Sequence, residues 1–292
     1  MAREGNAEAV EIIRVTGWNI NANIGGSGRR VSVSSSGNIT RRVARRIAQF
    51  VTRGARRFGV EAEFNGATPQ AVVNTASALG GIAMNVESYN HAVRESWKIV
   101  SDASCGSELV SPPMSGQVGH DQIKVACRAL SASNARVDRR CGLHVHIEAR
   151  DLDANAARRV VRNYTANQAL IDSLLAPSRR NNRFALPWND FELRQIENCA
   201  TIQDVARAQS GRYKTVNFAS FPRYGTIEFR QHQGTQNAEK ISNWVKLLDA
   251  LIDISTRREI GRCANLDAFL NALELDAETK SYFIERAMEL AQ

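Results

Sequence analysis

Residues 225–232, Gly-Thr-Ile-Glu-Phe-Arg-Gln-His, alternate between polar and apolar side chains in the manner of a β-strand. Side chains two residues apart on a strand point to the same face of the sheet. Glu228, Arg230 and His232 are therefore predicted to share one face. The apolar residues between them face the other way and need a layer of helices behind them. This segment predicts a sheet with one covered apolar face and one open polar face.

Two earlier segments repeat the pattern with acidic and imidazole side chains on one face. They are Gly-Val-Glu-Ala-Glu-Phe, with Glu61 and Glu63, and Cys-Gly-Leu-His-Val-His-Ile, with His144 and His146. A further extended segment, Ser-Glu-Leu-Val-Ser-Pro-Pro, contributes Glu108. Each pattern alone is also typical of an ordinary solvated strand face. Such faces usually carry Thr, Lys, Ser and Gln, however, and neighbouring carboxylates repel one another unless a cation lies between them.

Together these strands predict a site for a divalent cation and a phosphorylated ligand. Carboxylates with a histidine or two suit a hard ion such as magnesium, which keeps water ligands and is shared with substrate phosphates. Arginine supplies a planar pair of donors for phosphate or carboxylate. The sequence therefore favours a Mg–nucleotide site on the polar face.

Composition agrees with a globular protein that binds anions. The chain has 292 residues, 43% of them hydrophobic and 23% charged, and a formal net charge of +8. No uninterrupted apolar stretch is long enough to cross a bilayer, and the N-terminal residues lack the apolar core of a signal peptide. The five cysteines are an odd number without C-x-x-C spacing, which predicts reduced thiols rather than a disulfide framework. We therefore expect a cytoplasmic protein.

The order of predicted elements indicates an α+β fold with a largely antiparallel sheet and helices packed on one face. Two regions are expected, a basic N-terminal segment at 1–57 and a catalytic domain at 58–292. The first contains a loop or hairpin within 19–36 and an arginine-rich helix that ends near residue 53. Helices in the second are predicted at 69–79, 121–131, 153–175, 237–255, 266–273 and 277–290.

Six segments, in order, resemble the amidoligase family of the carboxylate–amine ligase superfamily, which includes glutamine synthetase and glutamate–cysteine ligase. They are GVEAEF, WKIVSDASCGSELVSPPM, CGLHVHI, NRFAL, RYKTVNF and YGTIEFRQHQGT, and they span roughly residues 58–260. The last is the most specific. The resemblance implies a sheet of the glutamine synthetase catalytic type, ATP and Mg²⁺ as cofactors, and a carboxylate and an amine as substrates.

The resemblance also implies a role for each matching residue. Metal ligands would be Glu61, Glu63, Glu108, His144 and Glu228. Arg230 would hold the acyl substrate or its phosphate. Asp102 matches the aspartate that guides the amine, although Asp-Ala-Ser replaces the usual Asp-Gly-Ser. ATP phosphates would be approached by Arg183, Arg212 and Lys214.

The implied reaction joins the two substrates through an acyl phosphate. Other hypotheses stay open: a guanidino-kinase-like phosphotransferase on the same fold, a nucleic-acid-binding relative that uses the arginines of residues 41–57, and a zinc hydrolase built on His144 and His146. Nucleic acid is the less favoured partner, because a diffuse basic surface explains much of the charge. Ligases of this superfamily often assemble, so a homo-oligomer stays open as well, and no membrane partner is expected.

Overall fold

The computed structural model describes residues 19–22, 31–34 and 56–291. The chain divides into two compact units, and the larger comprises Arg57–Met114 and Val118–Gln292. In the smaller unit, β1 (Asn19–Ala22) pairs antiparallel with β2 (Val31–Ser34), as the predicted hairpin requires. The helix predicted to end near residue 53 lies outside the described residues.

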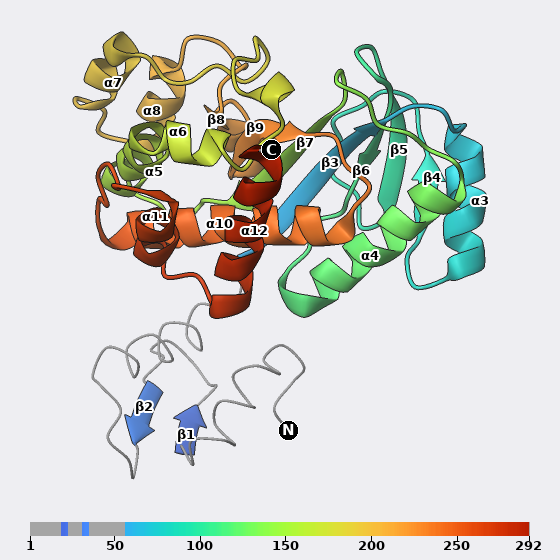
Figure 1. Ribbon diagram of the computed structural model, residues 1–292, viewed down its shortest axis with the longest axis horizontal. Coiled ribbons are helices and arrows are strands. Elements are labelled where there is room, and N and C mark those ends of the chain that lie inside the picture. The colour runs from blue at the N-terminus through green and yellow to red at the C-terminus, as the bar shows by residue number, and fades with distance from the viewer. Residues whose placement is uncertain (1–18, 23–30, 35–55, 292) are drawn as a thin grey trace. The chain divides into compact units, whose positions relative to one another are not determined.

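The larger unit is built on a seven-stranded sheet in the order β4-β5-β6-β3-β7-β9-β8 (Figure 1). Its strands are β3 (Phe58–Phe64), β4 (Met84–Val86), β5 (Trp97–Asp102), β6 (Gly106–Val110), β7 (Gly142–Glu148), β8 (Val216–Asn217) and β9 (Thr226–Gln233). Only the β4–β5 pair is parallel among these strands. The predicted α+β class and the largely antiparallel sheet are therefore confirmed.

Helices cover the apolar face of the sheet, as the alternation predicted. The main ones are α3 (Pro69–Leu79), α4 (Gly116–Ala132), α5 (Ala154–Ala166) and α10 (Ala238–Arg257), and α10 and α4 cross the sheet in Figure 1. Phe229 of β9 lies against Tyr164 of α5, with ring centroids 5.9 Å apart. Beyond them follow α11 (Leu266–Ala272) and α12 (Ala277–Ala291).

Local signals set the ends of α3 where the sequence predicted them. Thr68 caps the helix by accepting a hydrogen bond from the Ala71 amide, and Pro69 occupies the first turn, where its missing N–H costs nothing. Gly80 ends the helix with a φ of 70°, a positive value that glycine adopts without a steric penalty.

The single helix predicted over 153–175 is wrong. The structure has α5 and a short α6 (Gln168–Asp172), separated at Asn167. The Asn167 side chain donates to Gly261 O and accepts from the Cys263 amide, so it holds a segment nearly a hundred residues away in sequence. Periodicity along the chain cannot reveal such a tertiary contact. Between α6 and β9 lie four further short helices that we did not predict: η1 (Pro177–Arg179), α7 (Asp190–Ile196), α8 (Ile202–Ala208) and α9 (Phe221–Tyr224).

His232 does not share a face with Glu228 and Arg230, contrary to the prediction. Leu143 of β7 pairs with His232, and Val145 pairs with Phe229, so between these two pairs two residues of β9 oppose one of β7. This β-bulge inserts one residue and reverses the alternation beyond it. His232 consequently lies in the helical layer, 5.2 Å from the ring of Trp244 in α10.

The polar face is also less open than predicted. Glu63, His144, Glu228 and Arg230 are each at most 7% exposed. The chain at 87–96 lies against Lys98 of β5, whose Nζ donates to the carbonyl oxygens of Asn90 and Ala92. Another segment, from η1 to α7, approaches β9. These segments turn the polar face into a largely enclosed site.

Candidate functional site

Strand register brings the predicted side chains together. Glu61 of β3 pairs with His144 of β7. Glu63, two residues further along β3, pairs with Glu108 of β6. On the other flank, His146 of β7 pairs with Glu228 of β9. These residues therefore form one continuous cluster across four adjacent strands, in the order β6, β3, β7 and β9.

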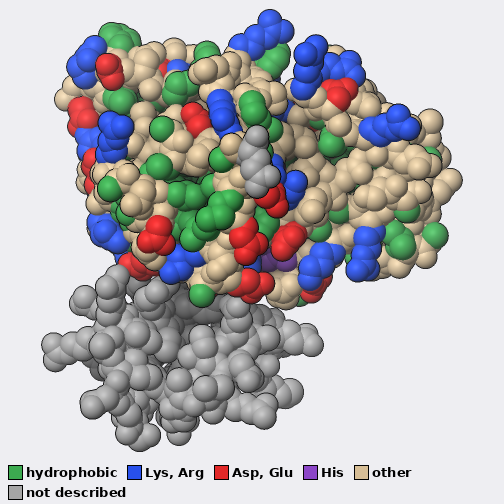
Figure 2. Space-filling view, viewed as in Figure 1, with side chains coloured by type: hydrophobic (Ala, Val, Ile, Leu, Met, Phe, Trp, Pro, Cys, Tyr) green, Lys and Arg blue, Asp and Glu red, His purple; other side chains and the backbone are tan. Residues whose placement is uncertain are grey.

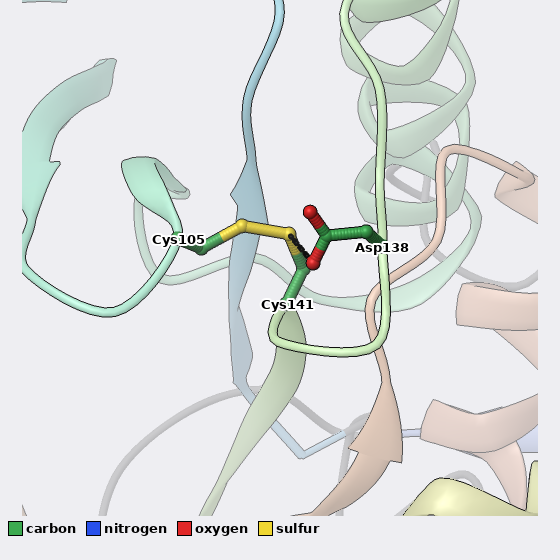
Figure 3. Close-up of side chains that lie close together, drawn as sticks. All are labelled: Cys105, Asp138 and Cys141. Carbon is green, nitrogen blue, oxygen red and sulfur yellow. Dashed lines mark hydrogen bonds between the residues drawn. A yellow bond between two sulfur atoms is a disulfide. The ribbon is translucent and has the colours of Figure 1, made fainter.

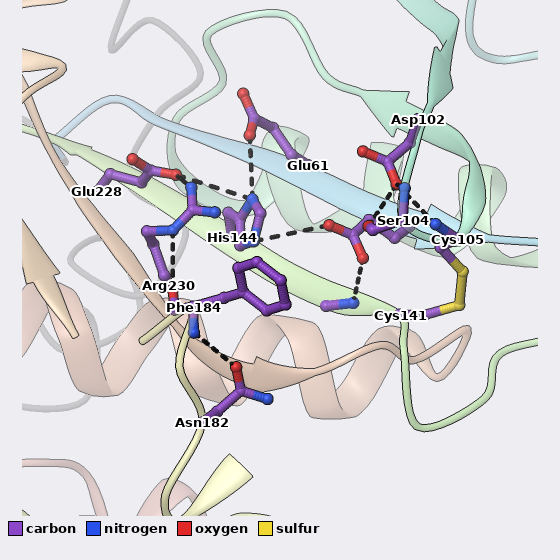
Figure 4. Close-up of polar contacts among 12 residues, drawn as sticks. Glu61, Asp102, Ser104, Cys105, Cys141, His144, Asn182, Phe184, Glu228 and Arg230 are labelled. Atoms are coloured by element: carbon purple, nitrogen blue, oxygen red, sulfur yellow. Dashed lines mark hydrogen bonds and ion pairs between the residues drawn. A yellow bond between two sulfur atoms is a disulfide. The ribbon is translucent and has the colours of Figure 1, made fainter. Parts of the chain in front are cut away.

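His144 lies at the centre of the cluster (Figure 4). Its Nδ1 is 3.3 Å from Glu61 Oε2 and 3.7 Å from Glu228 Oε1. Its Nε2 is 3.8 Å from Glu63 Oε1. A second imidazole supports the same carboxylates, because His146 Nε2 lies 3.4 Å from Glu61 Oε1. Each nitrogen of His144 thus faces a different part of the acidic group.

Arg230 and Asn217 hold Glu228 in place. The Arg230 guanidinium pairs with Glu228 Oε1, and the Asn217 amide donates to Oε2. Asn217 belongs to β8, where it pairs directly with Glu228. Arg230 also donates to Phe184 O at 3.3 Å. The sequence prediction missed Asn217, although its position in the segment Arg-Tyr-Lys-Thr-Val-Asn-Phe was a signal.

The carboxyl groups of the cluster differ in pKa, because each has different charged neighbours. Burial alone would raise the pKa of Glu61, but the charge of His146 and hydrogen bonds with both histidines hold it well below its usual range. Burial acts the same way on Glu228, and Arg230 and the histidines lower its pKa in spite of that. Burial and the neighbouring carboxylates raise the pKa of Glu108 well above its usual range. Like charges crowd at Glu108, which is the end of the cluster farthest from Arg230 in strand order.

Within the acidic cluster, two groups of side chains have the composition of a metal site. One is Glu61, His144 and Glu228, and the other is Glu63, Glu108 and His144. Within each group the ligand atoms lie within 4.8 Å of one another. Oxygen-rich sets with one imidazole fit magnesium or manganese better than the sulfur- and nitrogen-rich sets typical of zinc. All five predicted metal ligands are therefore brought together, and His144 lies between the two groups.

Asp102 lies at the edge of the cluster and closes a turn. Its Oδ1 accepts hydrogen bonds from the Ser104 amide at 2.8 Å, the Ser104 hydroxyl at 2.6 Å and the Cys105 amide at 2.8 Å. This Asx-type turn joins β5 to β6. The position of Asp102 near Glu108 fits the predicted neighbourhood, but one of its oxygens is already occupied by the turn.

Cys105 and Cys141 form a disulfide, which corrects the prediction of reduced thiols (Figure 3). The cysteines are 36 residues apart in sequence, yet each directly precedes one of the two strands that flank β3. Strands β6 and β7 both run antiparallel to β3, so their first residues meet beside its last. The side chain of Asn65, just after β3, contacts both sulfur atoms. Cys127, Cys199 and Cys263 are free.

Lys214, predicted to approach the ATP phosphates, is paired with Glu192 and not with the acidic cluster. Its buried Nζ lies 2.5 Å from Glu192 Oε2 and also donates to Pro187 O. Glu192 in turn accepts hydrogen bonds from the amides of Asn189 and Ser210. Lys214 therefore ties the start of α7 to the chain that precedes β8.

Arg183 and Arg212 lie on an exposed surface beside Arg230. Each stacks on the aromatic ring next to it in sequence, Arg183 on Phe184 at 4.7 Å and Arg212 on Tyr213 at 5.6 Å. The two rings meet edge to face, with centroids 5.4 Å apart. Arg230 reaches the same Tyr213 ring at 5.6 Å, so this aromatic–arginine surface is continuous with the site.

Arg179 is a site residue that the sequence prediction missed. It ends η1, and its guanidinium donates to Cys141 O beside β7. Gly142 leaves room for it, because a Cβ at that position would lie 2.9 Å from Arg179 Nη2 and 3.2 Å from His144 Nε2. The Gly142 amide donates to Glu63 Oε2 at 2.6 Å. No strand periodicity leads to Arg179, since it comes from a short helix far from the sheet strands in sequence.

Fold and site together define an α+β protein with a carboxylate–histidine–arginine cluster on one face of its sheet, suited to a divalent cation and an anionic ligand. The family model described as "Putative amidoligase enzyme" matches residues 54–252. The chain belongs to this family, whose name describes a ligase. The comparison with curated proteins found no match. Among the described helices, none has the length and apolar composition that a membrane span requires.

Proposed function

We propose that the protein is an ATP- and Mg²⁺-dependent ligase that forms an amide bond between a carboxylate and an amine. The observation that carries the proposal is the convergence of four glutamates and two histidines from adjacent strands, with Arg230 paired to Glu228 at one end. Membership of the amidoligase family supports the class of reaction. The order and polarity of the sheet are compatible with a glutamine synthetase type of catalytic sheet.

The donor sets described above fit magnesium. Glu61, His144 and Glu228 would hold one ion, and Glu63 and Glu108 would hold a second beside His144. A bound ion would neutralise charge on the phosphates. The role of the protein is to fix these carboxylates by strand pairing before the ligand arrives, which avoids reorganisation during the reaction.

The remaining residues divide the other tasks. Arg230 would orient the carboxylate substrate as it attacks the terminal phosphate of ATP and forms an acyl phosphate. The aromatic–arginine surface would stack the nucleotide base, with Arg183 and Arg212 near its phosphates. The amine then displaces phosphate. Glu108 is the better candidate than Asp102 to take the proton of the amine, because Asp102 Oδ1 already accepts three hydrogen bonds. Enclosure of the site would protect the acyl phosphate from water.

Hydroxylamine provides a test that does not require the natural amine. It attacks acyl phosphates and converts them to hydroxamates. The full-length protein would be incubated with Mg²⁺, ATP, hydroxylamine and a panel of carboxylic acids, and ADP and hydroxamate would be measured together. We expect both products in equal amounts with an acceptable acid, and neither with Glu228→Gln. ADP accompanied by a stable phosphorylated acceptor would instead identify a guanidino-kinase-like phosphotransferase.

Binding of nucleotide is testable before any substrate is known. A ligand at a hundredfold excess over its Kd stabilises the native state by roughly 2.7 kcal/mol, so Mg–ATP should raise the melting temperature of the wild type. Glu63→Ala and Glu228→Ala should lose this rise. If the wild type shows no rise, nucleic acid becomes the next ligand to test. Figure 2 shows Lys and Arg side chains scattered over the visible face of the larger unit, which favours a small ligand.

An ATP-dependent ligase acts where ATP is supplied, so we also propose a cytoplasmic location. The disulfide between Cys105 and Cys141 runs against this location, because cytosolic thiol reductants keep most protein cysteines reduced.

A further inference from the structure

Arg179 carries a buried charge that forms no ion pair in the described part of the chain, although the Glu63 carboxylate is near enough to attract it. The residue is only 3% exposed. Its Nη2 donates to Cys141 O, but its Nε finds no acceptor among the described residues. Lys214, which is equally buried, is paired with Glu192. A buried guanidinium without a direct ion pair is costly, because the protein replaces water poorly around the charge, and burial accordingly lowers the pKa of Arg179 despite the attraction of Glu63.

The guanidinium is directed into the acidic cluster. The space above Gly142 is filled by Arg179 Nη2 and His144 Nε2, which lie 2.9 and 3.2 Å from where a Cβ would be. Gly142, His144 and His146 alternate along β7 and share one face. Arg179 therefore lies on the Nε2 side of His144, where Glu63 is 3.8 Å away. Arg230 lies on the Nδ1 side, where it pairs with Glu228.

We propose that Arg179 binds an oxyanion of the polyphosphate class and, with Arg230, holds it from two sides of His144. The proposal rests on the proposed function for the identity of that anion as the nucleotide triphosphate. An oxyanion would supply both the missing ion pair and an acceptor for Nε–H. Gly142 has a defined part in this arrangement, because any side chain there would displace the guanidinium.

The test measures anion binding by calorimetry on the full chain in Mg²⁺, with tripolyphosphate as a probe that lacks a base. The variants are Arg179→Met and Arg179→Lys, with Arg180→Met as a matched control. Arg180 is the next residue along the chain, is half-buried, and donates only to Leu175 O among the described residues. We expect Arg179→Met to weaken tripolyphosphate binding about 10- to 100-fold, since a charge-assisted hydrogen bond is lost. Arg179→Lys should lose less, and Arg180→Met should bind normally.

Two further measurements separate anion binding from a purely structural role. Without anion, Arg179→Met should melt no lower than the wild type, because a buried charge that lacks an ion pair has been removed. It should bind Mn²⁺, followed by electron paramagnetic resonance, at least as tightly as the wild type. A structural role predicts the reverse: lower melting and weaker Mn²⁺ binding. If Arg179→Met does not fold, Gly142→Ala replaces it in the test. The alanine methyl group would displace the Arg179 guanidinium and should weaken tripolyphosphate binding in the same way.

Unchanged tripolyphosphate affinity in Arg179→Met would overturn the inference, and so would a wild type that does not bind the anion. The outcome is independent of the ligase activity. Anion binding that is lost in Arg179→Met supports the inference even in a protein that forms no hydroxamate. Normal hydroxamate formation by Arg179→Met, with normal anion affinity, would overturn the inference and leave the ligase proposal intact.

Discussion

Replacing Lys214 with methionine should destabilise the larger unit strongly while sparing its affinity for nucleotide. The side chains of Lys214 and Glu192 are 4% and 1% exposed, and their Nζ and Oε2 atoms are 2.5 Å apart. Removing one member of a buried ion pair leaves the other charge without a partner and costs about 3–5 kcal/mol. For a domain of this size, that corresponds to a fall in melting temperature on the order of 10 °C.

Urea unfolding of Lys214→Met, Glu192→Gln and the double variant would measure this coupling. Each single change should lower the free energy of unfolding by the amount above. The double variant should lose less than the sum of the two, by about 2–3 kcal/mol, because neither charge is then left alone. Affinity of the folded Lys214→Met protein for Mg–ATP, measured by calorimetry, should equal that of the wild type. A stable Lys214→Met variant with weakened ATP binding would refute this reasoning and restore the role that the sequence suggested.

Three further predictions concern acid stability, thiols and nucleotide stacking. Burial lowers the pKa of His232 from 6.5 to about 3. Below pH 6.5 the unfolded chain therefore binds a proton at this residue that the folded chain does not bind. The contribution of His232 to stability is present above pH 6.5 and is lost as the pH falls below that value. Urea unfolding should show a loss of about 2 kcal/mol between pH 7.5 and 5 from this group, and His232→Gln should lack that part of the slope; an equal slope in both proteins would contradict it. In protein purified without reductant, thiol titration after denaturation should find three reactive cysteines, rising to five with reductant, whereas five at the outset would exclude the bond between Cys105 and Cys141. Tyr213→Ala and Phe184→Ala should each weaken Mg–ATP about tenfold without changing tripolyphosphate affinity, because stacking on a base is worth roughly 1–3 kcal/mol; equal loss for both ligands would place the base elsewhere.

The face on which each polar strand residue lies could be predicted, because side chains alternate between the two faces along any strand. Alternation alone placed Glu61 and Glu63 on one face, and the same rule placed His144 and His146. The structure adds the register, which turns three short patterns into one cluster. Register depends on pairing between segments far apart in sequence, so a single strand contains only half of that information.

The residues that the sequence misplaced all depend on contacts between distant segments. His232 follows a bulge that exists only because β7 and β9 pair. Lys214 is bound by Glu192, which belongs to a helix that the sequence did not predict. Arg179 reaches the site from η1 through the space left by Gly142. Local patterns predict what one segment does, whereas these positions are set by which segments pack together.

The strands carry the candidate metal ligands, whereas other segments cover the site, and this separation affects how the substrate can change. The backbone positions of the candidate metal ligands are fixed relative to one another by the hydrogen-bonded ladder, so none can shift along the sheet without breaking strand pairing. The segments at 87–96 and from η1 to α7 contribute no ligand to that ladder. The segment at 87–96 also holds none of the residues assigned to the nucleotide, so it is free to vary in length and composition while the strands stay as they are. Exchange of that segment should therefore alter which acid or amine is accepted, with the affinity for the metal ion unchanged.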